Sequence, residues 1–248
     1  MRPSSAPGGA LALAAVIVLT VSGCGGGHHK ASAPRTSATT STATTTPPPP
    51  VYTQAKVGAA MLTPKEIGGD VSRIQVAVDA LKREQFPSCS LGALKLPGSP
   101  KLAIRQYTNS AKGKGEVKYA QAFALYDDAA SATSAFDFVK SKVTACPAKH
   151  HTPKRPLTEN TFILPHDDTW KAAQDTVGQW THVRGTEQEL FSRDVSKYNL
   201  FHYFYDYVQR GNLVISTLYW ERTEPKGSPD PIGQRATALL TKQLGKLG

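Results

Sequence analysis

Two runs rich in β-branched and aromatic residues near the carboxyl end constrain the fold of this chain most. They cover residues 200–210 (LFHYFYDYVQR) and 213–222 (LVISTLYWER), and only Gly211 and Asn212 separate them. A glycine and an asparagine between two such runs favour a tight turn, because both residue types tolerate positive φ angles. The pattern therefore predicts a β-hairpin.

Three tyrosines of the first run share one face, because alternate residues of a strand point the same way. A buried tyrosine hydroxyl needs a hydrogen-bonding partner, which an apolar core does not supply. This face could therefore form one wall of a groove for sugar, lipid or peptide. The alternative is a core face whose rings pack under helices, with the hydroxyls at the rim. The candidate ligand-binding residues are Tyr203, Tyr205 and Tyr207, with either Tyr219 or Trp220 from the second run.

Capping residues and apolar stripes predict three helices. Thr63 and Glu66 form the capping box of a short helix. Asp127 or Asp128 caps an amphipathic helix, and Asp230 begins the last one. The apolar stripes of these two longer helices are Ala132, Phe136, Val139 and Val143, and then Ile232, Ala236, Leu239, Leu240, Leu244 and Leu247.

Strand patterns alternate with these helices. Residues 102–107, 117–126 and 179–184 are predicted strands, while 73–83 fits either a strand or a helix. Residues 147–165 form a polar connection rich in proline. Strands that meet in hairpins, mixed with helices, favour an α+β fold with an antiparallel sheet and helices packed on it.

The beginning of the chain predicts export. Arg2 precedes an apolar run at residues 10–21, which is too short to cross about 30 Å of hydrocarbon but has the length of a signal-peptide core. The run ends in Val-Ser-Gly-Cys, which resembles the bacterial lipobox. This resemblance implies that residues 1–23 are a lipoprotein signal peptide and that Cys24 is acylated. The alternative is ordinary secretion with Cys24 as a spare thiol.

A tether is predicted to follow the signal peptide. Between residues 31 and 50, 19 of the 20 residues are Ala, Ser, Thr or Pro. Such a segment has too little apolar surface to offset the entropy of ordering, so residues 24–57 are predicted to be disordered and 58–248 to fold. The predicted domain has 25 basic and 19 acidic residues, a moderate excess that suits anionic surfaces. We find no nucleic-acid motif and expect no nucleic-acid partner.

Cys89 and Cys146 are the cysteines left to the domain. An even pair in an exported protein favours a disulfide bond. The alternative is a reactive thiol, which would need an activating neighbour. We find no such neighbour in the sequence next to either cysteine.

Other polar pairs carry weaker signals. His150 and His151 could contact phosphate or a metal, but a solvated loop explains them as well. The Asp127-Asp128 and Asp167-Asp168 pairs look like catalytic carboxylates, yet we interpret both as helix caps. The sequence has no Gly-Xaa-Ser-Xaa-Gly, no HExxH and no phosphate-binding loop. We therefore predict no catalytic residue, no metal and no cofactor.

Several segments together resemble a known family. They are MLTPKEIG, AFALYDDAASATSAFDFVKSKVTACP, YDYVQRGNLVISTLY and ATALLTKQL, which span most of residues 61–247. Their order and spacing are similar to the PknH-like extracellular sensor domain, here as a free-standing actinobacterial lipoprotein. The resemblance implies a twisted antiparallel sheet with flanking helices and a cleft for a ligand. The chain departs from that family in having one possible disulfide where the kinase sensor has two, and in lacking a kinase domain.

The leading functional hypothesis is a non-catalytic, lipid-anchored lipoprotein on the outer face of the cytoplasmic membrane. Its domain would bind a small molecule, a lipid or another component of the cell envelope. The alternatives are a carrier of a hydrophobic or lipid ligand and an envelope hydrolase. A closed apolar cavity would favour the carrier. A cleft that holds a histidine or carboxylate with a shifted pKa would favour the hydrolase. A groove with exposed aromatic residues would favour the binding domain.

Overall fold

The predicted hairpin forms the centre of a sheet. The computed structural model describes residues 48–68, 70–159 and 161–248, so the predicted signal peptide, Cys24 and most of the predicted tether lie outside the described residues. Strand β11 (Leu200–Arg210) pairs with β12 (Leu213–Thr223), and Tyr205 lies opposite Leu218. Gly211 has a φ angle of 54°, as the turn requires, and the carbonyl of Pro50 lies so close that no side chain would fit.

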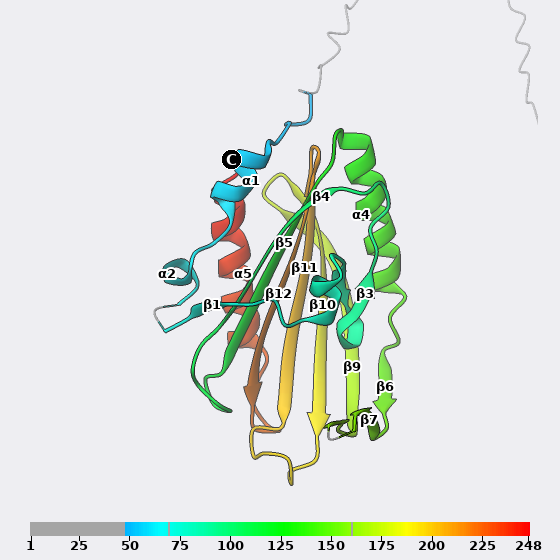
Figure 1. The fold of residues 1–248 in the computed structure, drawn as a ribbon, viewed down its shortest axis with the longest axis vertical. Coiled ribbons are helices and arrows are strands. Elements are labelled where there is room, and N and C mark those ends of the chain that lie inside the picture. Colours follow the sequence, from blue (N-terminus) through cyan, green and yellow to red (C-terminus); the bar gives the residue numbers. More distant parts are fainter. Residues whose placement is uncertain (1–47, 69, 160) are drawn as a thin grey trace, which may run out of the picture. The chain divides into compact units, whose positions relative to one another are not determined.

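Eight strands of the described residues form one antiparallel sheet (Figure 1). Their spatial order is β1-β4-β5-β12-β11-β10-β9-β6, so only short strands occupy the two edges. The bounds of the other six are β1 Ser72–Ile74, β4 Lys101–Thr108, β5 Val117–Leu125, β10 Trp180–Phe191, β9 His166–Val177 and β6 Lys149–Thr152.

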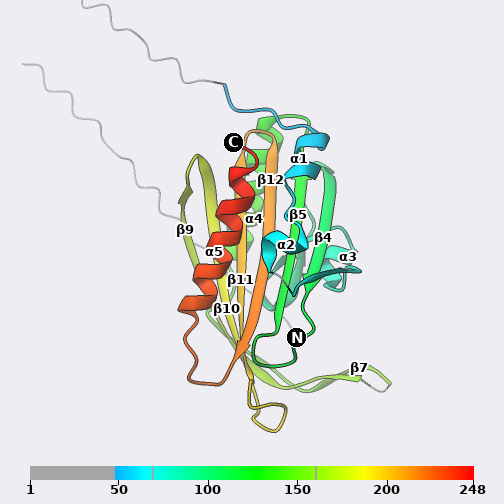
Figure 2. The ribbon, with the colours of Figure 1, turned by 90° about the vertical axis from the view of Figure 1, so that its left-hand side faces the viewer.

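Helices cover both faces of the sheet, which confirms the predicted α+β class (Figures 1 and 2). Helix α4 (Ala129–Thr144) packs on one face, and Asp128 caps it by accepting a hydrogen bond from the Ser131 backbone N–H at 2.7 Å. Helices α1 (Gln54–Ala60) and α5 (Asp230–Gly245) pack on the other face, next to the short α2 (Pro64–Ile67). Both predicted apolar stripes are buried.

Short elements lie beside α4 on the same face of the sheet. They are α3 (Asp79–Lys82), β2 (Phe86–Ser88), the 3-10 turn η1 (Cys89–Leu91) and β3 (Gly92–Leu94). The structure pairs Cys89 with Cys146, with their Cα atoms 6.2 Å apart, as predicted. The bond therefore connects η1 to the carboxyl end of α4. The ambiguous segment 73–83 contains the end of β1 and then α3, so it holds both kinds of element.

The described chain becomes ordered earlier than the predicted boundary at residue 58. Helix α1 begins at Gln54, inside the predicted tether. Tyr52 is buried and stacks on Trp180, with ring centroids 5.6 Å apart. The Asn212 side chain accepts a hydrogen bond from the Tyr52 backbone N–H at 2.7 Å. The turn of the hairpin therefore holds this segment through a contact between residues that are 160 positions apart in the chain.

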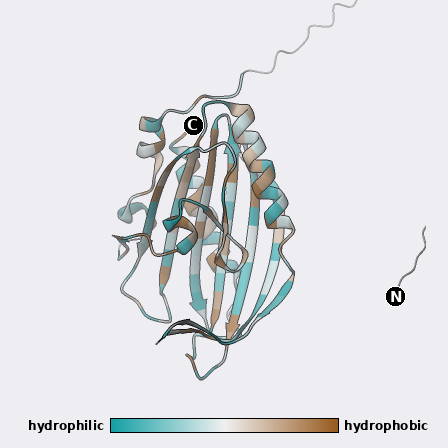
Figure 3. Cartoon of the chain, turned by 45° about the vertical axis from the view of Figure 1, so that its right-hand side comes forward, coloured by the Kyte–Doolittle hydropathy of each residue, from teal (hydrophilic) through white to brown (hydrophobic). Residues whose placement is uncertain are grey.

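The segment between α4 and β10 differs most from the sequence prediction. Residues 147–165 contain β6 and a small ladder of β7 (Arg155–Thr158) and β8 (Thr161–Ile163). Asp167 and Asp168 lie in β9, so the prediction that they cap a helix is wrong. Much of β9 is solvent-exposed and hydrophilic (Figure 3), which explains why its sequence lacks the apolar alternation of a strand.

No helix within the described ranges has both the length and the apolar character needed to cross a membrane.

Candidate functional site

The face of the sheet that carries α4 opens into a hollow of about 1030 Å³. We call it the concave hollow. The sheet strands β5, β9, β10, β11 and β12 contribute to its walls, and so do β1, β6, η1 and the β7–β8 ladder. Its aromatic lining residues are Phe201, Tyr203 and Trp220. Its charged and histidine lining residues are Asp79, Glu116, Lys118, His150, Arg155, His166, Glu189 and Arg222.

Strand register brings these side chains together. His150 lies opposite Asp168, Asp168 opposite Glu189, and Glu189 opposite Phe201. Because directly opposite residues of antiparallel strands project to the same face, they form one row across β6, β9, β10 and β11. Phe201 in turn lies opposite Arg222 on β12, so the row reaches the far wall of the hollow.

Trp170 fixes β9 against its neighbours. Its indole N–H donates a hydrogen bond to the Val143 carbonyl on α4 at 3.0 Å. Its ring lies directly over Gly185 of β10, where an added Cβ would come within 2.2 Å of the ring. A glycine is therefore required at this position, and Trp170 anchors β9 two residues from Asp168 and four from His166.

One wall of the hollow combines rings with cations. The Lys118 amino group lies 4.4 Å from the centre of the Trp220 ring, and the Arg222 guanidinium lies 5.0 Å from that of Phe201. Both cations pair with the same carboxylate, Glu116. Burial disfavours the charge of Glu116, but hydrogen bonds from Arg222 and the Gly113 N–H bring its pKa below the usual value. Burial also lowers the pKa of Lys118.

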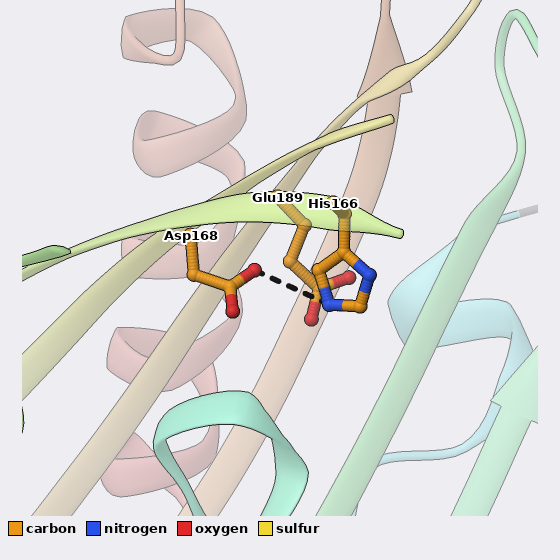
Figure 4. A group of neighbouring side chains, drawn as sticks. All are labelled: His166, Asp168 and Glu189. Carbon is orange, nitrogen blue, oxygen red and sulfur yellow. Dashed lines mark ion pairs between the residues drawn. The ribbon is translucent and has the colours of Figure 1, made fainter. Parts of the chain in front are cut away.

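The opposite wall holds His166, Asp168 and Glu189, whose side chains point toward one another (Figure 4). The His166 Nε2 lies 3.3 Å from the Asp168 Oδ1. The Tyr203 hydroxyl donates a hydrogen bond to the Glu189 Oε2 at 2.8 Å. Burial, together with the charge of Asp168, raises the pKa of Glu189 to about 7 despite that hydrogen bond. This wall is acidic and largely buried, in contrast to the cationic wall across the hollow.

The structure divides the predicted ligand-binding residues between the hollow and the core. Tyr203 and Trp220 line the hollow and contact each other, with ring centroids 5.8 Å apart. Tyr205 and Tyr207 are fully buried, and their hydroxyls donate to the Glu187 carboxylate and the Pro87 carbonyl. Tyr219 is buried on the other face, near α5. Tyr205 and Tyr207 therefore have hydrogen-bonding partners within the fold, and Tyr219 is not among the residues that line the hollow.

Sequence reasoning missed His166, Asp168 and Glu189 as a group. A usable signal is present in the polar alternation of two segments, His-Asp-Asp-Thr-Trp at 166–170 and Glu-Gln-Glu at 187–189. In the structure, alternate side chains of each segment, beginning with its first residue, point toward the face of the sheet that carries α4. Polar residues at period two indicate a strand whose inner face is polar, and such a face needs hydrogen-bonding partners or a ligand.

No protein-family model matches the chain, and no curated protein sequence matches it. Among solved structures, the chain is similar to the crystal structure of the extracellular domain of PknH from Mycobacterium tuberculosis. The two share 11% sequence identity with a TM-score of 0.49, over 79% of this chain and 98% of that one. At this level of similarity, the family resemblance stays a prediction.

Proposed function

We propose that residues 48–248 form a non-catalytic binding domain of the cell envelope whose ligand occupies the concave hollow, and that Glu189, a carboxylate with a raised pKa, serves binding and not hydrolysis. Acylated Cys24 holds the domain on the outer face of the cytoplasmic membrane. The observation that carries the proposal is the lining of the hollow, where Phe201, Tyr203 and Trp220 lie beside charged side chains. Ligand sites in proteins combine apolar and aromatic surface with a few placed polar groups in this way.

The cationic wall points to the class of ligand. Lys118 and Arg222 share the single carboxylate Glu116, so this wall keeps a net positive charge. Aromatic rings beside cations suit a polar, ring-containing molecule that carries an acidic group, such as an acidic sugar. The volume of about 1030 Å³ is just above the usual range for small-molecule sites, roughly 300–1,000 Å³.

The hollow does not match the closed apolar cavity expected of a lipid carrier. Eight of its lining residues are charged or histidine, and Lys118 and Arg222 stand over the rings that a hydrocarbon chain would contact. Moving an alkyl chain onto these groups would remove them from water without giving them new partners, which is costly. A polar ligand avoids this cost, so we favour it over a lipid tail.

Mass spectrometry of molecules that co-purify with the full chain tests this proposal. We expect a bound polar molecule with an acidic group, and we expect Trp220→Ala to weaken its binding roughly 10-fold through loss of ring contact. Val195→Ala is the control, because Val195 is 43% exposed and does not line the hollow. Equal binding by the Trp220 and Val195 variants, or recovery of an acyl lipid in the hollow, would contradict the proposal.

A further inference from the structure

His166, Asp168 and Glu189 each have one polar atom held by a neighbour and one atom that faces the other two residues. For His166 the held atom is Nδ1, which lies 2.7 Å from the Leu164 carbonyl oxygen. A carbonyl only accepts hydrogen bonds, so Nδ1 must carry the proton. In the neutral imidazole, Nε2 therefore presents a lone pair. A hydrogen bond from the other ring nitrogen to a carbonyl is also the usual way in which proteins orient a metal-binding histidine.

Asp168 is held in the same manner. Its Oδ2 accepts a hydrogen bond from the Thr152 hydroxyl at 3.2 Å. Its Oδ1 is buried and receives no hydrogen bond from any described residue, although the His166 Nε2 lies only 3.3 Å away. An unpartnered oxygen on an aspartate that is 4% exposed is costly. A positive charge between the two atoms stabilises this arrangement, and either a proton on Nε2 or a metal ion supplies it.

Glu189 completes the group. The Tyr203 hydroxyl donates a hydrogen bond to its Oε2 at 2.8 Å. Each of the three residues offers one atom that could ligate a metal ion, and these three atoms lie within 4.8 Å of one another. Among the described residues, no lysine or arginine forms an ion pair with Asp168 or Glu189, and the basic group beside Asp168 is His166 itself.

We propose that His166, Asp168 and Glu189 bind a divalent transition-metal ion, with Zn²⁺ as the representative. Bonds of about 2.0–2.1 Å at a tetrahedral angle place two ligand atoms roughly 3.3 Å apart. The His166 Nε2 and Asp168 Oδ1 already have this separation, and a side-chain rotation of Glu189 brings in the third ligand. One neutral imidazole and two carboxylates give a charge of −2, which the ion balances. The imidazole favours a transition metal over Ca²⁺ or Mg²⁺.

The metal site opens to the concave hollow, because His166 and Glu189 are among the residues that line it. Three protein ligands leave a coordination position that water or an acidic group of a ligand can fill. The inference goes beyond the proposed binding function and does not depend on it, since the metal alone is the probe. It differs from the prediction made from the sequence, which assigns no metal to the chain.

Isothermal titration of Zn²⁺ into the metal-stripped full chain tests the site. Every sample carries His28→Asn and His29→Asn and has no histidine tag, because a histidine pair outside the domain can also bind metal. We expect one Zn²⁺ per chain, and we expect Asp168→Asn and His166→Gln each to weaken binding about 100-fold or more. Tyr203→Phe, which removes only the hydroxyl that holds Glu189, should weaken it by about 10–100-fold.

The matched control is His151→Asn combined with Asp167→Asn. These residues form an exposed pair at 2.7 Å across β6 and β9, and Asp167 precedes Asp168 in β9, so it projects to the other face. Circular dichroism verifies that each variant is folded. The Co²⁺-loaded protein should show visible absorption bands that disappear in Asp168→Asn and persist in the control. No saturable Zn²⁺ binding, or a loss of binding in the control with none in folded Asp168→Asn, would overturn the assignment.

Discussion

Tyr203 and Tyr205 project from the same face of β11, yet their surroundings differ. Tyr205 is 0% exposed and packs against Trp170 with ring centroids 5.3 Å apart, while Tyr203 reaches the concave hollow. Each hydroxyl donates to a carboxylate of β10, Glu187 for Tyr205 and Glu189 for Tyr203. A tyrosine in the core is therefore tolerated because β10 supplies an acceptor at each position.

Replacing Tyr205 should separate its packing from its hydrogen bond. Tyr205→Ala removes a fully buried ring and should lower the free energy of unfolding by about 3–5 kcal/mol, as for other buried aromatic residues. Tyr205→Phe keeps the ring and should cost about 1–3 kcal/mol through loss of the bond to Glu187. Urea denaturation measures both. Phe162→Ala, at a position 50% exposed, should change stability by less than about 0.5 kcal/mol. An equally small change in Tyr205→Ala would mean that this ring is not part of the core.

His202 should make stability depend on pH. Burial lowers its pKa to about 4, against about 6.5 in an unfolded chain. As pH falls from about 6.5 to about 4, the unfolded state binds a proton that the folded state does not. The free energy of unfolding should therefore fall over this range by up to about 3 kcal/mol, and the contribution is fully present above pH 6.5.

Comparing the free energies of unfolding of the natural chain and His202→Gln isolates this effect. The other titrating groups contribute equally to the pH dependence of both proteins, so their contributions cancel. The stability difference between them should shrink by about 3 kcal/mol from pH 7 to pH 4. His151→Gln is the control, since His151 is exposed and pairs only with the exposed Asp167. Parallel stability curves for the natural chain and His202→Gln would show that His202 titrates as it does in the unfolded state.

At the scale of elements, the disulfide joins two pieces that pack on the same face of the sheet. Cys89 lies in η1, and Cys146 follows the carboxyl end of α4. Ser90, beside Cys89, donates its backbone N–H to the Glu187 carboxylate at 2.7 Å. The bond therefore holds the segment that covers β10 and β11 next to the concave hollow.

Removal of the disulfide should destabilise the fold considerably. The cysteines are 57 residues apart, and the loop-entropy relation gives roughly 4 kcal/mol for a loop of this length. The double variant Cys89→Ser with Cys146→Ser should lower the free energy of unfolding by several kcal/mol in urea denaturation. Non-reducing peptide mapping of the exported natural chain should recover the two cysteines cross-linked. Two free thiols in that material would contradict the prediction.

At the scale of the whole molecule, the net charge adds to the anchoring that we propose. The chain has a formal net charge of +10 and a sequence pI of about 9.5. A basic protein held near anionic headgroups is attracted to them over about a Debye length, which adds to the hold of an acyl anchor. Cys24, which we predict to carry the lipid, lies outside the described residues.

The anchoring prediction can be tested by metabolic labelling with an alkyne fatty acid. Cys24→Ala should remove the label and release the chain from the membrane fraction, because the acyl chains supply most of the membrane affinity. Cys89→Ser with Cys146→Ser is the control and should stay labelled. A Cys24→Ala chain that is labelled as strongly as the natural one would exclude this residue as the anchor.

The sequence by itself determined the elements whose signals are local. The Gly211-Asn212 turn, the Asp128 cap and the apolar stripes of α4 and α5 each depend on neighbouring residues, and the structure contains all of them. The antiparallel α+β class followed from their order. Asp167 and Asp168 misled the prediction, because an aspartate pair fits a helix cap as well as a strand with one exposed face and one polar inner face.

Tertiary structure alone decided which side chains meet. His166, Asp168 and Glu189 come together only because β9 pairs with β10 in one register, with Asp168 opposite Glu189. A shift by one residue would turn each of these side chains to the opposite face, and no local pattern fixes the pairing. Likewise, the sequence places Tyr203 and Tyr205 on one face, but only the packing of Trp170 and α4 leaves the first at the hollow and buries the second. Register and burial depend on contacts between distant segments, so they are properties of the folded chain.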